Sequence, residues 1–249
     1  MIYALAIQKG GVAKTTSAAI LAQAAAYKGK KALAVDLDPQ ANLSFMLGAD
    51  PTAPGCYELL HGTPAADLIQ KTAQGVDVLA ASWNLATITS SKGSARRLKT
   101  ALEPIEKKYR YIFIDVPAMG GELQYNALMA ANRLVIPLSA DIFNLQSLYQ
   151  ITDAAQQIRA NRPELEIAGF ILTQYDKRGK ISQHMKETIT KQAEAVGVPY
   201  LGAIRPAVVV KEAAALQLSL YEYAPKSKTA ADYLAILERL DAKKHIKER

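Results

Sequence analysis

An apolar run that leads into a glycine turn, close to the start of the chain, constrains the fold more than any other feature. Residues 2–19 read IYALAIQKGGVAKTTSAA: an apolar stretch, a turn rich in lysine and glycine, and small residues that suit the start of a helix. A strand that passes through such a turn into a helix gathers unpaired backbone N–H groups and the positive end of the helix dipole at one point. The segment therefore predicts a phosphate-binding loop.

The residue types in this turn fit that interpretation. Gly10 and Gly11 let the backbone approach an anion closely, and Lys14 supplies a positive charge for the β- and γ-phosphates of a nucleotide. The hydroxyl of Thr15 is suited to bind Mg²⁺. The alternative is a lysine- and glycine-rich turn that joins an ordinary strand to an ordinary helix.

The turn departs from the common phosphate-loop pattern and matches a rarer one. Gln8 and Ala13 stand where G-x-x-x-x-G-K-[ST] has its glycines, whereas residues 9–16 read K-G-G-x-x-K-T-T. This resembles the deviant Walker A motif of the ParA/MinD ATPases. The resemblance implies that Lys9 and Lys14 are catalytic, Lys9 by reaching the nucleotide of a partner subunit. It assigns nucleotide binding to Lys9, Gly10, Gly11, Val12, Ala13, Lys14, Thr15 and Thr16.

A pair of aspartates follows the second apolar run. Residues 31–38 read KALAVDLD, and in an extended segment Asp36 and Asp38 point to the same side. Ligands bind at the carboxyl ends of strands in an open parallel sheet, so both carboxylates are candidates for the same site. The stretch VDLDPQAN resembles the family's second motif, which implies that Asp38 positions the attacking water and Asp36 belongs to the Mg²⁺ shell. Two ordinary surface aspartates are the alternative.

A third acidic residue ends another apolar strand. Tyr111–Asp115 reads YIFID, and an aspartate at that point has the geometry of a Walker B residue, which holds Mg²⁺ directly or through water. The loop behind it, residues 116–121, is expected to move when the γ-phosphate leaves. Members of the resembled family usually read D-x-P-P here, and this chain has Ala118 in place of the second proline.

Two later stretches resemble the parts of the family that contact the nucleotide base. The segment GFILTQYDKR makes Thr173 and Gln174 candidate contacts to adenine. In the segment AIRPAVVVKEA the family typically has I-P-R, whereas here Arg205 precedes Pro206. Pro206 is carried over as a nucleotide-binding residue.

The alternation of apolar runs and helix-forming segments predicts the fold class. Such spacing indicates βαβ units with right-handed crossovers and a parallel sheet. We expect a single α/β domain of the P-loop NTPase type over residues 1–249, with a mostly parallel twisted sheet and helices on both faces. Predicted strands cover 31–38, 76–80, 111–115, 133–140, 167–173 and 200–204; predicted helices cover 16–29, 94–109, 145–160, 180–196, 207–217 and about 227–241, before a basic tail at 243–249.

The positive charge of the chain is unevenly distributed. The net charge is +7, yet residues 1–80 hold six basic and six acidic residues, so the excess lies in the remainder. Residues 177–191 alone hold five basic residues against one acid. A polyanion such as DNA is the predicted partner, and a solvated helix face is the alternative. Candidate DNA-binding residues are Lys177, Arg178, Lys180, Lys186, Lys211, Lys243, Lys244 and Lys247.

Composition excludes several other classes. A lone cysteine, Cys56, excludes a disulfide framework or a cysteine-built cluster within one chain and favours a reducing cytosol. No apolar run approaches the ~20 residues that span a bilayer, and the basic tail lacks Phe and Trp, so we expect no membrane insertion. Because the chain starts at its first strand, we expect no operator-reading domain ahead of it.

The resemblance as a whole implies a ParA/Soj-type partition ATPase in the cytoplasm, associated with the nucleoid. Its cofactors would be ATP and Mg²⁺, and the ATP-bound homodimer would bind DNA non-specifically. A ParB-like, centromere-binding protein would stimulate a weak intrinsic hydrolysis and release the DNA, which positions a plasmid, a chromosome or another cargo. One alternative is a MinD-like positioning ATPase that acts at a membrane or a protein complex. A metabolic P-loop enzyme, such as a small-molecule kinase or an amide-forming synthetase, is the other.

Overall fold

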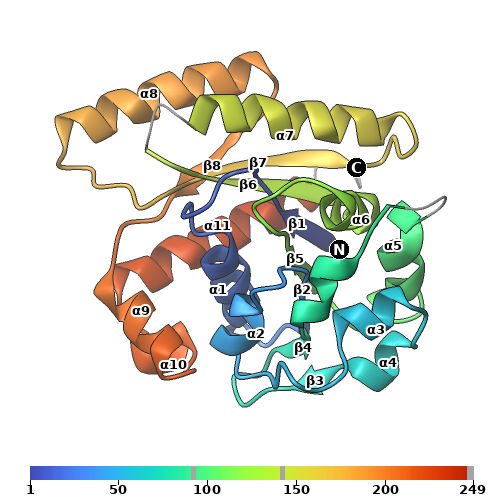
Figure 1. Ribbon diagram of the computed structural model, residues 1–249. Coiled ribbons are helices and arrows are strands. Elements are labelled where there is room, and N and C mark those ends of the chain that lie inside the picture. The colour runs from blue at the N-terminus through green and yellow to red at the C-terminus, as the bar shows by residue number, and fades with distance from the viewer. Residues whose placement is uncertain (91–93, 141–143, 246–249) are drawn as a thin grey trace.

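One continuous sheet of eight strands forms the centre of the molecule. The computed structural model describes residues 1–90, 94–140 and 144–245 (Figure 1). Its strand order is β3-β4-β2-β5-β1-β6-β7-β8, and every neighbouring pair is parallel except β3 with β4. The strands are β1 (Ile2–Leu5), β2 (Ala32–Asp36), β3 (Gln70–Lys71), β4 (Asp77–Leu79), β5 (Tyr111–Asp115), β6 (Arg133–Ser139), β7 (Glu166–Thr173) and β8 (Tyr200–Ala203).

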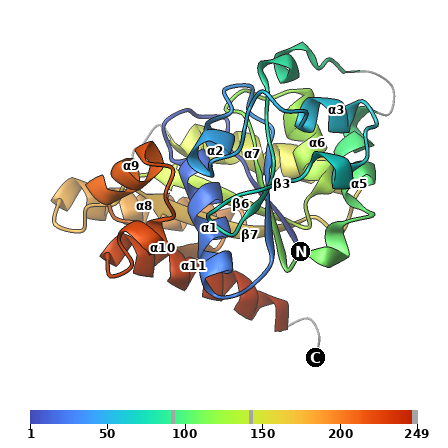
Figure 2. The same cartoon turned by 90° about the horizontal axis from the view of Figure 1, so that it is seen from below.

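Helices cover both faces of this sheet, which confirms the predicted fold class (Figure 2). One face packs on α1 (Lys14–Tyr27), α2 (Asn42–Met46), α9 (Val208–Ala215), α10 (Leu220–Tyr223) and α11 (Lys228–His245). The other packs on α3 (Cys56–Leu60), α4 (Ala65–Leu68), α5 (Arg97–Leu102), α6 (Glu122–Ala130), α7 (Asn144–Arg159) and α8 (Lys180–Ala195). No helix in the described part of the chain is long and apolar enough to cross a bilayer.

The middle strands are buried on both faces, as parallel strands between two helical layers must be. All residues of β1, β2 and β5 are buried. Register places Leu5 of β1 and Asp36 of β2 beside Asp115 of β5, so the two aspartates end neighbouring strands at the same level. The sheet thereby brings the ends of three apolar runs to one edge.

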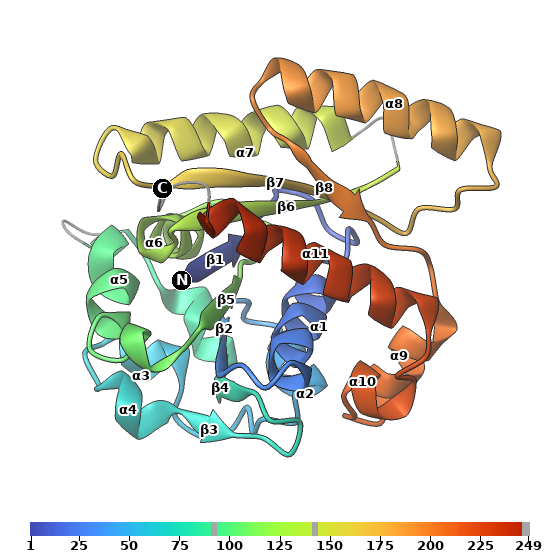
Figure 3. The same ribbon diagram turned by 180° about the vertical axis from the view of Figure 1, so that it is seen from behind.

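The first and last helices lie together on one face. Figure 3, seen from behind, shows α11 passing along the sheet beside α1. The predicted end of α1 is confirmed by a glycine cap: the Gly29 N–H donates to Ala26 O at 2.8 Å and the Lys30 N–H to Ala25 O at 2.9 Å. Gly29 has φ +67, a conformation that glycine adopts without strain.

The prediction of one helix over residues 94–109 is wrong. The segment divides into a 3-10 turn at Ser94–Arg96, α5, and a second 3-10 turn at Glu106–Lys108. Pro104 explains the interruption, because proline lacks the N–H that continues a helix and its ring collides with the preceding turn. The structure also adds α6, and extends the C-terminal helix to residue 245. Residues 246–249 of the predicted tail lie outside the described residues.

Candidate functional site

The turn between β1 and α1 forms an open loop at the carboxyl edge of the sheet. Helix α1 begins at Lys14, so its first N–H groups face the loop. At Gly10 and Gly11 an added Cβ would meet no protein atom within 4 Å, so the chain itself does not fill the space in front of them. Gly11 has φ +73, which favours glycine. A cradle of this kind suits an anion that lies against the backbone.

Ala13 adopts a left-handed conformation, with φ 59° and ψ 36°, immediately before α1. An alanine there carries a steric cost that glycine would avoid. Val12, one residue earlier, is buried, and its carbonyl accepts a hydrogen bond from the Thr173 hydroxyl at 3.0 Å. The loop therefore keeps the shape that the glycine of the common motif provides, although this chain has no glycine at position 13.

We expect Ala13→Gly to raise the free energy of unfolding by about 0.5–1 kcal/mol. The substitution relieves the left-handed strain, and the larger flexibility of glycine in the unfolded chain offsets part of this gain. The matched control is Ala18→Gly in the middle of α1, where glycine should cost about 1 kcal/mol or more. Urea unfolding of both variants measures the difference, and a destabilised Ala13→Gly protein would contradict the assignment of strain.

Lys14 points its charge into the loop. The residue is 7% exposed, and its Nζ donates to the Lys9 carbonyl oxygen at 3.2 Å. Burial lowers the pKa of Lys14, while the charges of Asp115 and Asp38 raise it. A nearly buried ammonium that faces open backbone N–H groups is the counter-charge expected for a phosphate.

Asp36 is fully buried and bonded to its own chain. One oxygen accepts from the Asp38 N–H at 3.0 Å, and the other accepts from the N–H and the hydroxyl of Ser44, at 2.8 and 2.7 Å. Burial raises the pKa of Asp36 to about 6, and these hydrogen bonds oppose the rise. The carboxylate thus holds the segment from β2 to α2 in place. Its predicted place in the Mg²⁺ shell stays a prediction.

Asp115 is the carboxylate whose bonding is incomplete. It is fully buried, and neither oxygen meets hydrogen-bond geometry with any described residue. Burial first, and then the charge of Asp36, hold its pKa well above the usual range, while Thr15 and Lys14 oppose the shift. An orphaned buried carboxylate normally has a partner that the protein alone does not supply.

The donor set around Asp115 fits a hard cation. A carboxylate and the Thr15 hydroxyl are the oxygen ligands that Mg²⁺ prefers. No group of three His, Cys, Asp or Glu side chains in the described ranges could hold a metal unaided. This agrees with the usual mode of Mg²⁺ binding, in which phosphate oxygens and water complete the shell.

Asp38 lies beside the same loop. It is half-buried, and its Oδ1 accepts from the Gln40 N–H at 3.0 Å, which closes a local turn. Its charge acts on Lys14, so the sheet brings the three predicted aspartates and the predicted lysine together. Its role in positioning water stays a prediction.

A cavity of about 250 Å³ adjoins the loop on the side of β7. Thr173 and Gln174, at the end of β7, line it with Pro206. Thr173 is 1% exposed and its hydroxyl is within hydrogen-bond distance of the Val12 and Leu138 carbonyls, so it braces the loop. Gln174 donates to the Gly11 carbonyl at 3.2 Å. The structure thus groups the residues predicted to contact a base.

Tyr233 of α11 also lines this cavity, and the sequence did not predict that its hydroxyl takes part in the site. Its hydroxyl lies 3.2 Å from the Ser17 hydroxyl of α1. Tyr233 is buried, and the position of its hydroxyl depends on contact with a segment more than two hundred residues away. Ser44 was missed for the same reason. At the start of α11, the Ser227 hydroxyl accepts a hydrogen bond from the Ala230 N–H, while Asp232 binds Arg205.

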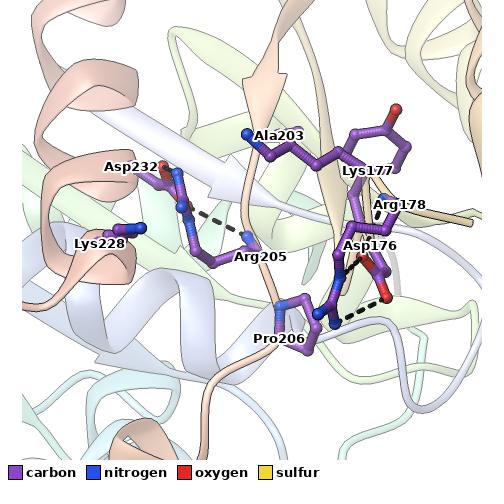
Figure 4. A pocket seen from close by; sticks show the side chains of 9 residues that line it. Asp176, Lys177, Arg178, Ala203, Arg205, Pro206, Lys228 and Asp232 are labelled. Atoms are coloured by element: carbon purple, nitrogen blue, oxygen red, sulfur yellow. Dashed lines mark hydrogen bonds and ion pairs between the residues drawn. The ribbon is translucent and has the colours of Figure 1, made fainter.

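Next to this cavity is a second one of about 390 Å³ with a charged wall (Figure 4). Arg205 forms a bidentate pair with Asp232, at 2.7 and 2.8 Å. Arg178 pairs with Asp176 at 3.2 Å. Lys177 and Lys228 complete the basic lining; Lys228 was not among the predicted DNA-binding residues.

The other candidate DNA-binding residues are dispersed. Lys180 begins α8, next to Lys177 and Arg178. Lys186 lies over the rings of Tyr175 and Tyr200, 5.6 and 5.2 Å from their centroids. Lys211 lines the smaller cavity. The side chains of Lys243 and Lys244, and all of Lys247, lie outside the described residues.

Known proteins share this arrangement over most of the chain. The sequence model of a family described as an AAA domain matches residues 1–167. Chromosome partitioning protein ParA of Caulobacter vibrioides (strain NA1000 / CB15N) is 37% identical over 199 residues, which cover 76% of this chain and 74% of that protein. Sporulation initiation inhibitor protein Soj of Bacillus subtilis (strain 168) is 32% identical over 250 residues, with 97% and 98% covered. The crystal structure of cobyrinic acid a,c-diamide synthase from Mycobacterium smegmatis, with bound ATP analogue and magnesium, has a TM-score of 0.80 at 29% identity, covering 99% of this chain and 95% of that one.

Proposed function

Because the chain belongs to the family of ParA and Soj chromosome-partitioning ATPases, we propose that it hydrolyses ATP, with Mg²⁺, to drive a cycle of DNA binding and release. The observation that carries the proposal is the buried Asp115 beside Lys14 and the open glycine loop, with no hydrogen-bond partner for its carboxylate among the residues that the structure describes. These are the parts that a nucleotide triphosphate with its cation would complete.

The nucleotide occupies the loop and the adjoining cavity. Backbone N–H groups of the loop and Lys14 bind the phosphates, and the base enters the cavity of about 250 Å³ beside Gln174 and Pro206. Thr15 and Asp115 hold Mg²⁺, which when bound neutralises negative charge on the phosphate oxygens. A magnesium ion on Asp115 also removes the cost of leaving that carboxylate without a partner.

Hydrolysis and dimer formation depend on two further residues. The carboxylate of Asp38 orients the attacking water, and Lys9 reaches the phosphates of a second subunit. The intrinsic rate is weak, since charge in the transition state awaits an added group, and a ParB-like protein accelerates the step. Because each Lys9 contacts the phosphates of the other subunit, the two subunits form a closed dimer only while ATP is not hydrolysed.

DNA binding is assigned to the basic surface around the charged cavity. Arg178 and Arg205 are each neutralised by an aspartate, so the net positive charge of the lining comes from Lys177 and Lys228. Lys180 extends this surface onto α8. Two such surfaces in one dimer bind a duplex with far higher affinity than one alone. DNA binding is therefore coupled to ATP, and the protein is expected on the nucleoid.

The charge-reversed double variant Lys177→Glu/Lys228→Glu should lower ATP-dependent affinity for duplex DNA by at least about tenfold. Because the dimer loses two lysines from each subunit, the salt slope should fall by about three to four. The matched control is Lys99→Glu/Lys107→Glu, which makes the same charge change at exposed residues elsewhere. Fluorescence anisotropy with a labelled duplex at several salt concentrations measures both quantities. Equal loss in the two double variants would contradict this assignment.

Two other activities are distinguished by direct assays. A MinD-like protein would co-sediment with liposomes in the presence of ATP and would not bind DNA. The other is an amide-forming enzyme like cobyrinic acid a,c-diamide synthase, to which the chain is similar in structure. Its ATP turnover would require a carboxylic acid substrate and a nitrogen donor. Stimulation of ATP hydrolysis by DNA together with a ParB-like protein supports partition; stimulation by a small carboxylic acid with a nitrogen donor contradicts it.

A further inference from the structure

A groove of about 520 Å³ lies between α3, α4 and α5, and neither the nucleotide nor the DNA surface uses it. In Figure 1 these short helices are the cyan and green elements at the lower right, on the opposite face of the sheet from α9 and α10. Leu59, Leu60 and Ile105 form an apolar floor. Pro64 and Ala66 are exposed at its rim.

The charge on this groove has one sign. Arg96 and Arg97, at the start of α5, are its charged lining residues, and the described lining includes no carboxylate. Arg96 is exposed to solvent. The described floor residues Leu59, Leu60 and Ile105 are apolar and buried, so an occupant would place apolar side chains inward and keep negative charge at the rim. Charge complementarity therefore selects an acidic, amphipathic partner.

The walls of the groove are fixed in advance. The Cys56 N–H of α3 donates to the Ala80 carbonyl at 2.8 Å. A side chain at Gly55 would come within 2.1 Å of the same oxygen, so the backbones pack directly. On the other side, the Leu98 N–H of α5 donates to the buried Asn126 side chain of α6 at 3.1 Å. A preformed groove loses little entropy when it binds.

We propose that this groove docks an acidic amphipathic segment of a partner protein. Its apolar residues lie against Leu59, Leu60 and Ile105, and its carboxylates pair with the exposed Arg96, in the helix-in-groove mode of recognition. A volume of this size holds a few leucine-sized side chains, so the recognised segment is one or two helical turns. Docking does not involve Lys14 or Asp115 and proceeds without nucleotide.

Two synthetic helical peptides of equal length, one built from leucine and glutamate and one from leucine and lysine, test the proposal by fluorescence anisotropy. The glutamate peptide should bind at least about tenfold more tightly than the lysine peptide, and Arg96→Glu, which leaves one positive and one negative charge on the groove, should abolish this preference. Thr100→Trp, an exposed lining position, should block the groove to both peptides. Lys99→Glu, on the same helix but outside the groove, should leave both affinities unchanged.

Several results would overturn the proposal. The first is that the glutamate peptide fails to bind the unsubstituted protein. The second is that neither Arg96→Glu nor Thr100→Trp changes the binding of the peptide. The third is that dodecanoate, a small carboxylate with an apolar tail, displaces the peptide and binds more tightly, which would make the groove a small-molecule site. Circular dichroism confirms that each variant is folded. The Lys14→Ala variant should bind the peptide as the unsubstituted protein does, although it should not bind ATP. Failure of the docking proposal and failure of the ATPase proposal can therefore be told apart.

Discussion

Asp115→Asn is expected to abolish Mg²⁺-dependent ATP hydrolysis and, at the same time, to stabilise the ligand-free protein by about 1–3 kcal/mol at neutral pH. The amide cannot supply the negative charge that holds the cation. The substitution also removes a buried carboxylate that has no hydrogen-bond partner in the described part of the chain. A loss of catalytic activity together with a gain in folding stability indicates that a residue serves function at a cost to the stability of the fold.

The stability gain should depend on pH. The folded protein holds the Asp115 proton more tightly than the unfolded chain, because its pKa is raised above the ordinary value of 3.8. The unsubstituted protein therefore becomes less stable as the pH rises from 3.8 through the raised pKa of Asp115. The Asp115→Asn variant has no carboxyl group to ionise at this position, so its stability does not fall for this reason. Urea unfolding at about pH 7.5 and about pH 5 should show a larger difference between the two proteins at the higher pH.

Asp36→Asn is the matched control for this prediction. Both aspartates end neighbouring strands and both are fully buried, but Asp36 accepts three hydrogen bonds from its own chain. An amide keeps only one acceptor oxygen, so this variant should be less stable than the unsubstituted protein. Stabilisation by both substitutions would show that burial alone matters, and would contradict the assignment of Asp115 to a cation.

Lys9→Ala is expected to retain ATP binding and to lose ATP-dependent dimer formation. The phosphates of the same subunit are bound by Lys14 and the loop N–H groups, whereas Lys9 acts on the nucleotide of the second subunit. Asp38→Ala is the comparison variant: it should retain ATP binding and the dimer but lose hydrolysis. Size-exclusion chromatography with ATP and Mg²⁺ separates the two. An unaltered dimer in Lys9→Ala would refute the action of this lysine across subunits.

The sequence was sufficient to predict the elements that form the edge of the site. Asp36 and Asp115 each end an apolar strand, and the carboxyl ends of parallel strands lie at one edge of the sheet, so their place at that edge was predicted. The pairing of β2 with β5, which makes the two aspartates neighbours, was not predicted. The left-handed conformation of Ala13 agrees with the glycine that the common motif has at that position. Local rules therefore described the loop and the strand ends well.

Other contacts could not be predicted, since they join side chains far apart in the chain. Arg205 pairs with Asp232, 27 residues later in the chain. Helix α6 was not predicted because Gln124 and Asn126 are buried on its inner face, where polar residues interrupt the apolar pattern that identifies a helix. Asn126 is buried because it caps α5, a role that depends on tertiary packing. Polar residues that serve distant partners are thus the main source of error.

The most direct test of the account is calorimetry of ATP binding to the purified protein in the presence of Mg²⁺. We predict one nucleotide per chain with a binding free energy of about −8 kcal/mol, corresponding to an affinity of about 1 μM, and loss of this binding in Lys14→Ala. Absence of ATP uptake by protein that circular dichroism shows to be folded would contradict the assignment of the glycine loop, Lys14 and Asp115 to a nucleotide site.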